Sequence, residues 1–338
     1  MGVKVALLYN LAEEEGRGGD DPPDSQAELD SEQTVFAIRE SLLSAGHQVT
    51  LIEGNLSSLM QLQSESVDIA FNVCEGYLGR NREAHVPAVL EMLNIPVTGS
   101  DVLTLAASLD KPTTKKLLRY SQISTPKFQV FYSAMDVLST DLAFPLFVKP
   151  AHEGSSMGIS ADSKVSTEAE LRERVAFVTK NYHQPALVEE FITGREFTVG
   201  VMGNEELITL PVMEISFTNV PRESNCVYSY QYKKEWTERS NFFCPAPISD
   251  FTARVLQETA KQAYRAVGCR DFGRVDFRLA AGGTPYVIEI NPLPGLAPGY
   301  SDFPVAAEAA GISYCELINR ILDYALHRYQ IRSAVLQA

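Results

Sequence analysis

Residues Gly273–Arg278 (GRVDFR) and Tyr286–Pro292 (YVIEINP) decide the fold, because polar residues interrupt two apolar runs at every second position. This period of two predicts two β-strands, and alternate side chains of a strand share a face. The polar faces carry Arg274 and Asp276 on the first strand and Glu289 and Asn291 on the second.

A hairpin across residues 280–284 would bring Asp276, Glu289 and Asn291 together. Three oxygen ligands, two of them anionic, suit Mg²⁺, which completes its shell with waters and substrate phosphates. Arg274 shares the face and is suited to binding an anion. The alternative is a structural salt bridge between Arg274 and Glu289.

The stretch Phe147–Gly158 (FVKPAHEGSSMG) has the composition of an anion-binding loop. An apolar strand delivers Lys149 to a turn of small residues between Gly154 and Gly158. Glycines let backbone N–H groups approach an anion, and serine hydroxyls add donors. The alternative is an ordinary turn. The sequence contains neither G-x-x-x-x-G-K-[ST] nor G-x-G-x-x-G, which excludes the Walker and Rossmann motifs.

Two further segments have candidate binding chemistry. The strand Leu187–Ile192 (LVEEFI) ends in two acids, whose side chains and exposed backbone could bind an adenine edge and ribose hydroxyls. Its alternative is a solvated strand end. The loop Pro294–Asp302 (PGLAPGYSD) could present backbone N–H groups to a carboxylate or an oxyanion, or it could simply connect two elements.

Strands and helices alternate along the first hundred residues, which predicts a parallel sheet covered on both faces. The expected strands are Val3–Tyr9, Val49–Glu53 and Asp68–Val73, and the expected helices are Ser31–Ala45 and Ala84–Leu93. A second unit is expected from Lys111–Tyr120, Lys127–Phe131, Leu146–Pro150, Thr167–Asn181 and Ala186–Phe191. A third is expected from Glu196–Met202, Glu206–Glu214, Asp250–Val267, Asp271–Leu279, Pro285–Ile290 and Ser313–Tyr329. The chain is therefore expected to be an α/β protein divided into residues 1–105, 106–192 and 193–338.

Two polar segments interrupt these units. Ala12–Asp30 is strongly acidic and contains helix breakers, so we expect a mobile loop unless a cationic ligand orders it. Asn219–Phe242 is too long for an ordinary connection and carries aromatic and cationic side chains, which favours a lid over a ligand.

The composition excludes several classes of protein. The chain has 338 residues, is 45% hydrophobic and has a net charge of −14. Such a chain can bury a core, and its charge disfavours nucleic acid as a partner. It has no apolar run long enough to span a membrane. Five widely spaced cysteines without a C-x-x-C pair indicate reduced thiols and a cytoplasmic location.

Taken in order, these segments resemble the ATP-grasp superfamily and, within it, the D-alanine–D-alanine ligase family. The resemblance extends from about Asp68 to Leu326. Its motifs are FNVCEG (71–76), PVTGS (96–100), LDK (109–111), the Lys149 loop, EEF (189–191), GRVD (273–276) and EINP (289–292).

The resemblance implies an N-terminal α/β domain and two ATP-grasp subdomains that clasp a nucleotide. It implies ATP contacts from Lys111, Lys149, Ser156, Met157, Glu189, Glu190, Phe191, Ile192, Glu196 and Lys233. Within this set Glu189 would bind the adenine amino group and Glu196 the ribose. It implies that Asp276, Glu289 and Asn291 hold two Mg²⁺ ions, or Mn²⁺, and that Arg274, Ser155 and the Gly295 backbone act in catalysis.

The family's reaction agrees with these parts. A carboxylate attacks the γ-phosphate of ATP to give an acyl phosphate, and an amine then displaces phosphate to form an amide. Small amino-acid or carboxylate substrates, a homodimer and a role in peptidoglycan synthesis follow from the resemblance.

The substrate positions depart from the family's pattern. The glutamate that precedes the first helix and binds the first ammonium falls at Leu29, so Glu28, Asp30 or Glu32 would have to replace it. The other departures are Glu75 in place of a histidine, Lys234 in place of a lid tyrosine, and Asp302 in place of a leucine after Ser301. We therefore expect an amino-acid or peptide ligase like the D-alanine–D-alanine ligases, and an acceptor other than D-alanine is the first alternative. Other open possibilities are action on a secondary metabolite, a non-catalytic ATP-binding paralogue, and a carboxylate kinase that stops at the acyl phosphate.

Overall fold

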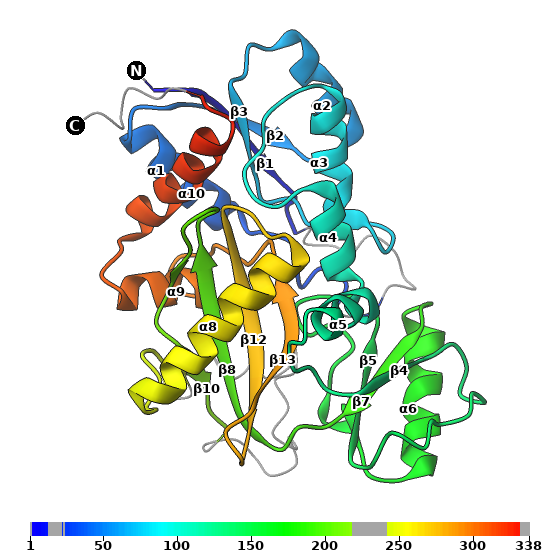
Figure 1. Cartoon of the computed structure of the whole chain (residues 1–338). Coiled ribbons are helices and arrows are strands. Elements are labelled where there is room, and N and C mark those ends of the chain that lie inside the picture. Colours follow the sequence, from blue (N-terminus) through cyan, green and yellow to red (C-terminus); the bar gives the residue numbers. More distant parts are fainter. Residues whose placement is uncertain (1, 13–21, 23, 218–241, 332–338) are drawn as a thin grey trace.

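The computed structural model describes residues 2–12, 22, 24–217 and 242–331. Three sheets organise them, one for each expected unit (Figure 1). The prediction of an α/β fold is confirmed. The boundaries at 105/106 and 192/193 stay a prediction.

The N-terminal sheet is parallel, with the strand order β2-β1-β3. Its strands are β1 (Lys4–Tyr9), β2 (Gln48–Glu53) and β3 (Ile69–Asn72). The helices of this part are α1 (Glu32–Ser44), α2 (Leu56–Gln61), α3 (Arg82–Met92) and α4 (Val102–Leu109), with a 3₁₀ turn η1 (Leu62–Ser64). Ser31 caps α1 by accepting the Thr34 N–H, which fixes where this helix begins. The sequence did not predict α2 and α4, which are short.

The central sheet is antiparallel, with the order β4-β7-β5-β6. Its strands are β4 (Phe128–Phe131), β5 (Leu146–Pro150), β6 (Lys164–Val165) and β7 (Ala186–Glu190). The helix α6 (Glu168–Asn181) covers it, α5 (Lys111–Tyr120) leads into it, and η2 (Ala161–Ser163) is a 3₁₀ turn.

The C-terminal sheet is antiparallel, with the order β11-β10-β8-β12-β13 and with β9 paired to β8. Its strands are β8 (Gly194–Met202), β9 (Ile208–Thr209), β10 (Met213–Ile215), β11 (Phe242–Phe243), β12 (Phe272–Ala280) and β13 (Pro285–Asn291). The expected single strand Glu206–Glu214 is wrong. Pro211 lies between β9 and β10 and has no N–H to donate to a ladder.

Two faces of the C-terminal sheet have opposite character. The helix α8 (Asp250–Val267) buries Leu256, Ala260 and Tyr264 against the apolar face, a spacing that keeps one helical stripe on the sheet. Gly268 ends this helix with a φ of 89°, a conformation that favours glycine. The polar side chains of β8 and β12 are therefore left on the other face, toward the central sheet.

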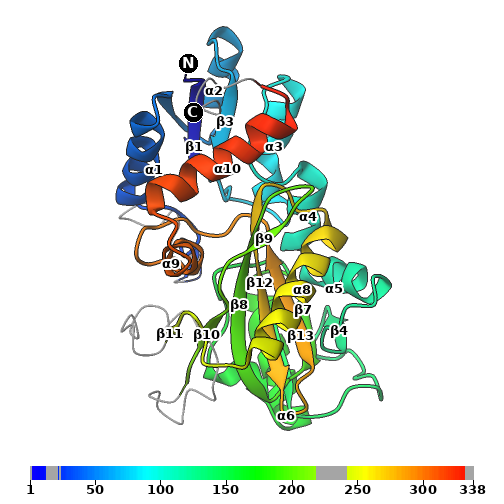
Figure 2. The ribbon, with the colours of Figure 1, turned by 60° about the vertical axis from the view of Figure 1, so that its left-hand side comes forward.

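The last helices join the N-terminal part of the molecule. Figures 1 and 2 both place α10 (Tyr314–Arg328) beside α1, and the two helices share a core with β1. The helix α9 (Asp302–Ala309), which the sequence did not predict, contributes Phe303 and Ala307 to this core. No helix in the described residues is long and apolar enough to cross a membrane.

The acidic segment before α1 is only partly described. Within residues 24–30, Asp24 is buried and accepts hydrogen bonds from the Tyr182 hydroxyl and the Gly158 N–H. Glu28 is buried against Arg82. Distant residues therefore supply donors for two carboxylates of this segment, and the expected mobility of residues 12–30 stays a prediction. The expected lid lies mostly outside the described residues, and Lys233 and Lys234 with it.

Candidate active site

The hairpin of β12 and β13 brings together the polar residues that the sequence placed on one face. Asp276 stands opposite Glu289, and Arg274 stands opposite Asn291. The Asn291 Nδ2 donates to the Asp276 Oδ2 at 3.3 Å, and the Thr198 hydroxyl of β8 donates to the Asp276 Oδ1 at 2.6 Å. The predicted convergence of these side chains is confirmed.

Arg274 makes a two-pronged contact within its own strand. Its Nε and Nη2 each lie 2.9 Å from an oxygen of Asp276, and its Nη1 lies 3.5 Å from the Asp302 carboxylate. Burial disfavours the charged guanidinium, but Asp276 and Asp302 overcome that effect and raise the pKa of Arg274. The alternative of an Arg274–Glu289 salt bridge is not found among the described residues. Glu289 instead lies 3.3 Å from the Lys111 Nζ.

A cleft separates this face from the central sheet. Its empty volume, open solvent included, is about 760 Å³. Residues of both sheets line it, including Lys149, Ser156, Glu189, Glu190, Phe191, Ile192, Glu196, Arg274, Asp276, Glu289 and Asp302. Most of the residues expected to contact a nucleotide or its metal ions therefore border one cavity.

Three buried charged residues, Glu189, Lys149 and Lys115, lie together beside the central sheet. The Glu189 carboxylate lies 2.9 Å from the Lys149 Nζ and 2.6 Å from the Lys115 Nζ. Burial would raise the pKa of Glu189, but the two lysines reverse this and lower it. Its carboxylate is thus ionised and shared by two cations.

The two lysines differ in what surrounds them. Burial, together with the charges of Lys149 and Arg119, outweighs Glu189 and lowers the pKa of Lys115 to about 8. Burial also disfavours the charge of Lys149, but Glu189 and Glu289 overcome that effect and raise its pKa. Lys149 therefore faces the acids of the cleft.

Glu196 is the next acid along the cleft. It lies 2.8 Å from the Arg278 Nη2, and burial raises its pKa despite that arginine. Arg278 also stacks near the Phe191 ring, with its guanidinium carbon 4.9 Å from the ring centroid. Phe191, which follows β7, is therefore in contact with the C-terminal sheet.

The small-residue loop after β5 has an unusual backbone. Ser155 and Ser156 have φ values of 45° and 62°, a region that non-glycine residues seldom adopt. Ser156 lines the cleft, whereas Met157 is buried. The Lys111 Nζ donates to the Glu153 carbonyl just before this loop, so Lys111 lies between it and the hairpin.

The loop after β13 packs tightly on itself. The Ala297 N–H donates to the Ser301 Oγ at 3.1 Å, and a Cβ on Gly295 would come within 2.9 Å of the same oxygen. Only glycine at position 295 leaves Ser301 in this place. Asp302 follows at the start of α9 and reaches Arg274, so this loop borders the hairpin face.

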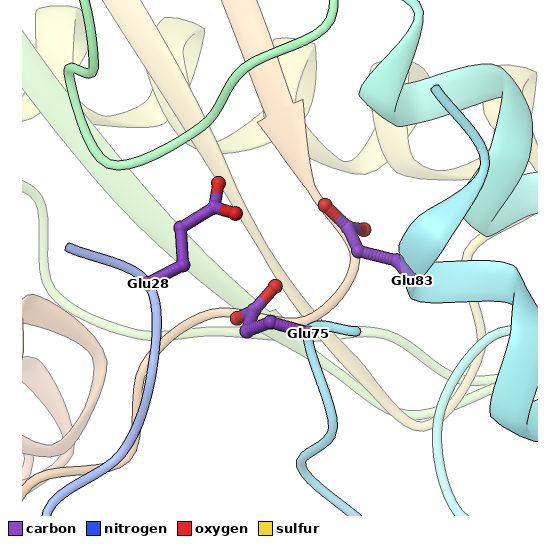
Figure 3. Close-up of side chains that lie close together, drawn as sticks. All are labelled: Glu28, Glu75 and Glu83. Carbon is purple, nitrogen blue, oxygen red and sulfur yellow. The ribbon is translucent and has the colours of Figure 1, made fainter. Parts of the chain in front are cut away.

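Glu75 lies away from the nucleotide cleft, in a cluster with Glu28 and Glu83 (Figure 3). One carboxylate oxygen of each lies within 4.8 Å of the others. Glu28, Asp30 and Glu32 are the candidates to replace the family's glutamate that binds the first ammonium. Of these, Glu28 is the one that lies in the cluster with Glu75.

Sequence reasoning missed several residues of these clusters. Lys115 repeats one helical turn after Lys111 on α5, so helical spacing could have linked the two. Arg278 shares the polar face of β12 with Arg274, which the period of two could have shown. Nothing in the sequence pattern points to Glu83, which lies on a helix whose sequence shows no strong amphipathic pattern.

The family described as D-ala D-ala ligase C-terminus matches residues 117–323. The uncharacterized protein y4sG of Sinorhizobium fredii is 37% identical over 307 residues, which is 88% of each chain. A D-alanine–D-alanine ligase of Bordetella avium is 35% identical over 288 residues, covering 84% of this chain and 86% of that protein. The crystal structure of a D-alanine–D-alanine ligase from Bacillus anthracis complexed with ATP has a TM-score of 0.74 at 23% identity, covering 97% of this chain and 99% of that one.

Proposed function

This chain belongs to the D-alanine–D-alanine ligase family and is an ATP-dependent ligase, and on that premise we propose how its residues form an amide bond. The observation that carries the proposal is the polar face of the β12–β13 hairpin. There Arg274, Asp276 and Glu289 border the same cleft as Lys149, and Asn291 donates to Asp276. A carboxylate substrate and the γ-phosphate of ATP would meet at this face.

The nucleotide would lie between the two antiparallel sheets. Glu189, Glu190, Phe191 and Ile192 supply the edge that would hold the base, and Glu196 would bind the ribose. Lys149 and Lys111 would bind phosphate oxygens, with Ser156 and Met157 in the adjoining loop. Lys233 is proposed to join them from outside the described residues.

The donor set at the hairpin fits a magnesium ion. Asp276 and Glu289 are opposed carboxylates, and the Asn291 Nδ2 lies 3.3 Å from Asp276, so two anionic oxygen ligands with an amide beside them suit a hard cation. These three residues would hold two Mg²⁺ ions, or Mn²⁺. The ions would neutralise charge on the phosphoryl group during transfer.

The chain's own residues would then carry the reaction forward. The acyl carboxylate attacks the γ-phosphorus and releases ADP, and the amine attacks the acyl carbon and releases phosphate. Arg274 and the Gly295 backbone N–H would stabilise the oxyanion of the tetrahedral intermediate, with Ser155 nearby. Ser301 and Asp302 would contact the second substrate, because their loop borders Arg274. Lys234 would contact it from outside the described residues.

Two further proposals concern the acceptor substrate and the oligomeric state. Glu75 in place of the family's histidine and Asp302 in place of its leucine support an acceptor other than D-alanine. A homodimer is proposed from the family resemblance, and light scattering on the purified chain would test it.

One assay tests the ligase proposal. Purified protein with ATP and Mg²⁺ is screened against a panel of amino acids for ADP release, and products are identified by mass spectrometry. We expect ADP in equal amount to a new amide. ADP with hydroxamate-trapped acyl phosphate but no amide would indicate a carboxylate kinase, and nucleotide binding without any ADP release would indicate a non-catalytic paralogue.

A further inference from the structure

The acidic cluster of Glu28, Glu75 and Glu83 gathers carboxylates from three separate parts of the chain. Glu28 lies before α1, Glu75 follows β3, and Glu83 is in the first turn of α3. Figure 3 shows the three carboxylates directed toward one another. Like charges this close repel, so the arrangement needs positive charge to stabilise it.

Arg82 supplies positive charge to only part of this cluster. Its Nε and Nη2 lie 3.1 and 2.6 Å from Glu28, its Nη2 lies 2.9 Å from Glu153, and its Nη1 donates to the His152 carbonyl. This guanidinium is committed to Glu28 and Glu153. Glu75 and Glu83 must be neutralised by something else.

Glu83 is the informative member of the cluster. It is only 8% exposed, and its carboxylate has no hydrogen bond or ion pair with any residue in the described part of the chain. Glu75 has none there either, although it is partly exposed. A carboxylate buried without a partner is costly, and burial together with the neighbouring acids raises the pKa of both groups. A bound cation would remove that cost.

The cluster adjoins the reacting end of the proposed site. The Arg82 Nη2 lies 2.9 Å from the Glu153 carboxylate, and the Lys111 Nζ donates to the Glu153 carbonyl and lies 3.3 Å from Glu289. A molecule held by Glu75 and Glu83 therefore has its other end near the hairpin face. Since Arg82 is committed to Glu28 and Glu153, no cation of the described chain is left within bonding distance of Glu75 and Glu83.

Charge favours a nitrogen cation over a metal ion at this cluster. One oxygen of each carboxylate lies within 4.8 Å of the others, a limit that either kind of cation satisfies. The guanidinium of Arg82, which lies 2.6 Å from Glu28, repels a divalent ion more strongly than a singly charged ammonium.

We propose that an amino-acid substrate of this ligase carries two cationic nitrogens, as a diamino acid does, and that Glu75 and Glu83 bind the additional one. The proposal rests on the proposed function, since it assigns the substrate class of the same site. Alanine has only its α-ammonium and would leave Glu75 and Glu83 without a cation.

Binding to the full chain tests the proposal directly. With Mg²⁺ and a non-hydrolysable ATP analogue present, calorimetry compares 2,3-diaminopropionate, 2,4-diaminobutyrate, ornithine and lysine, in both enantiomers, with alanine, 2-aminobutyrate, norvaline and norleucine. We expect at least one diamino acid to bind about tenfold or more tightly than its neutral counterpart. Equal or weaker binding of every diamino acid would overturn the proposal.

Variants identify the residues responsible. Glu83→Gln and Glu75→Gln should each reduce the preference for the diamino acid to about twofold or less. The control Glu91→Gln, at an exposed position of the same helix, should keep it. A preference that persists in both Glu83→Gln and Glu75→Gln would overturn the assignment. A metal control uses the Asp276→Asn variant, in which the proposed hairpin site is disabled. Mn²⁺ binding to this variant that disappears when Glu83 is also changed would show that the cluster is a metal site, and would overturn the assignment.

Turnover separates this proposal from the ligase function. ADP release with neutral amino acids and no diamino preference would sink the substrate assignment and leave the ligase intact. Tight diamino-acid binding that depends on Glu83, with no ADP release from any amino acid, would support the pocket and refute the ligase function.

Discussion

The hairpin face and the acidic cluster both gather carboxylates, but they balance the charge differently. At the hairpin, Asp276 is bonded to Arg274, and Glu289 lies beside Lys111. In the acidic cluster, Arg82 pairs with Glu28, while Glu75 and Glu83 have no cation of the chain within bonding distance in the described residues. The first region is organised before any ligand arrives, as positioning for phosphoryl transfer requires. In the acidic cluster, the positive charge that neutralises Glu75 and Glu83 would come from the proposed cationic substrate.

Removing a proposed metal ligand should have the largest effect on this comparison. Asp276→Ala and Glu289→Ala should each lower kcat about a thousandfold or more, because charge on the transferred phosphoryl group would no longer be neutralised. Steady-state ADP release measures this, with thermal unfolding to confirm that the variants fold. Near-normal kcat in both variants would show that the hairpin acids are merely structural.

Arg274 tests whether the hairpin needs geometry as well as charge. Arg274→Lys keeps the charge but loses the planar fork that holds both oxygens of Asp276. We expect kcat to fall about a hundredfold, the scale of losing one oxyanion donor. A variant within about threefold of the parent in ADP release would mean that a point charge suffices there.

The sequence predicted the hairpin face and not the acidic cluster, for a physical reason. Arg274, Asp276, Glu289 and Asn291 lie on two strands that are close in the chain, so period-two alternation and one short turn define their meeting. Their roles stay predictions. Glu28, Glu75 and Glu83 come from a loop, another loop and a helix, and only tertiary packing brings them together.

The remainder of the fold shows the same division. Long elements with one apolar face, such as α8 (Asp250–Val267), were predicted to the residue. Short elements were missed, and Pro211 divided a strand that propensity alone would have continued. Among the described cysteines, Cys74 and Cys269 are buried and Cys315 is exposed, a difference that no local pattern encodes.

Lys115 belongs to a third charged group, in the central sheet, whose acid Glu189 is already paired with two lysines. Its Nζ lies 2.6 Å from Glu189 and donates to the Thr125 hydroxyl, which in turn donates to the Val287 carbonyl of β13. Lys115→Met leaves Glu189 with Lys149 alone, and breaking a buried pair costs about 3 kcal/mol of unfolding free energy. Denaturant unfolding measures the loss. The control Lys116→Met, exposed on the same helix, should change stability by less than about 0.5 kcal/mol. Equal effects of the two variants would show that the buried triad adds no stability.

The smallest effect should come from the unbalanced cluster, as a pH dependence of stability. Burial and Glu28 outweigh Arg82 and raise the pKa of Glu83 from 4.5 to about 8. A carboxyl with a raised pKa in the fold contributes most below about pH 4.5, and that contribution is lost as the pH rises through about 8. Glu83→Gln stays neutral, so its Tm should exceed that of the parent by about 2–4 °C at pH 8.5 and match it near pH 5. Glu91→Gln should show no such divergence. A bound diamino acid would supply positive charge to Glu83, so it should restore the Tm of the parent at pH 8.5 and leave the Tm of Glu83→Gln unchanged. A Tm difference between parent and variant that is the same at both pH values would mean that Glu83 is already neutralised within the chain.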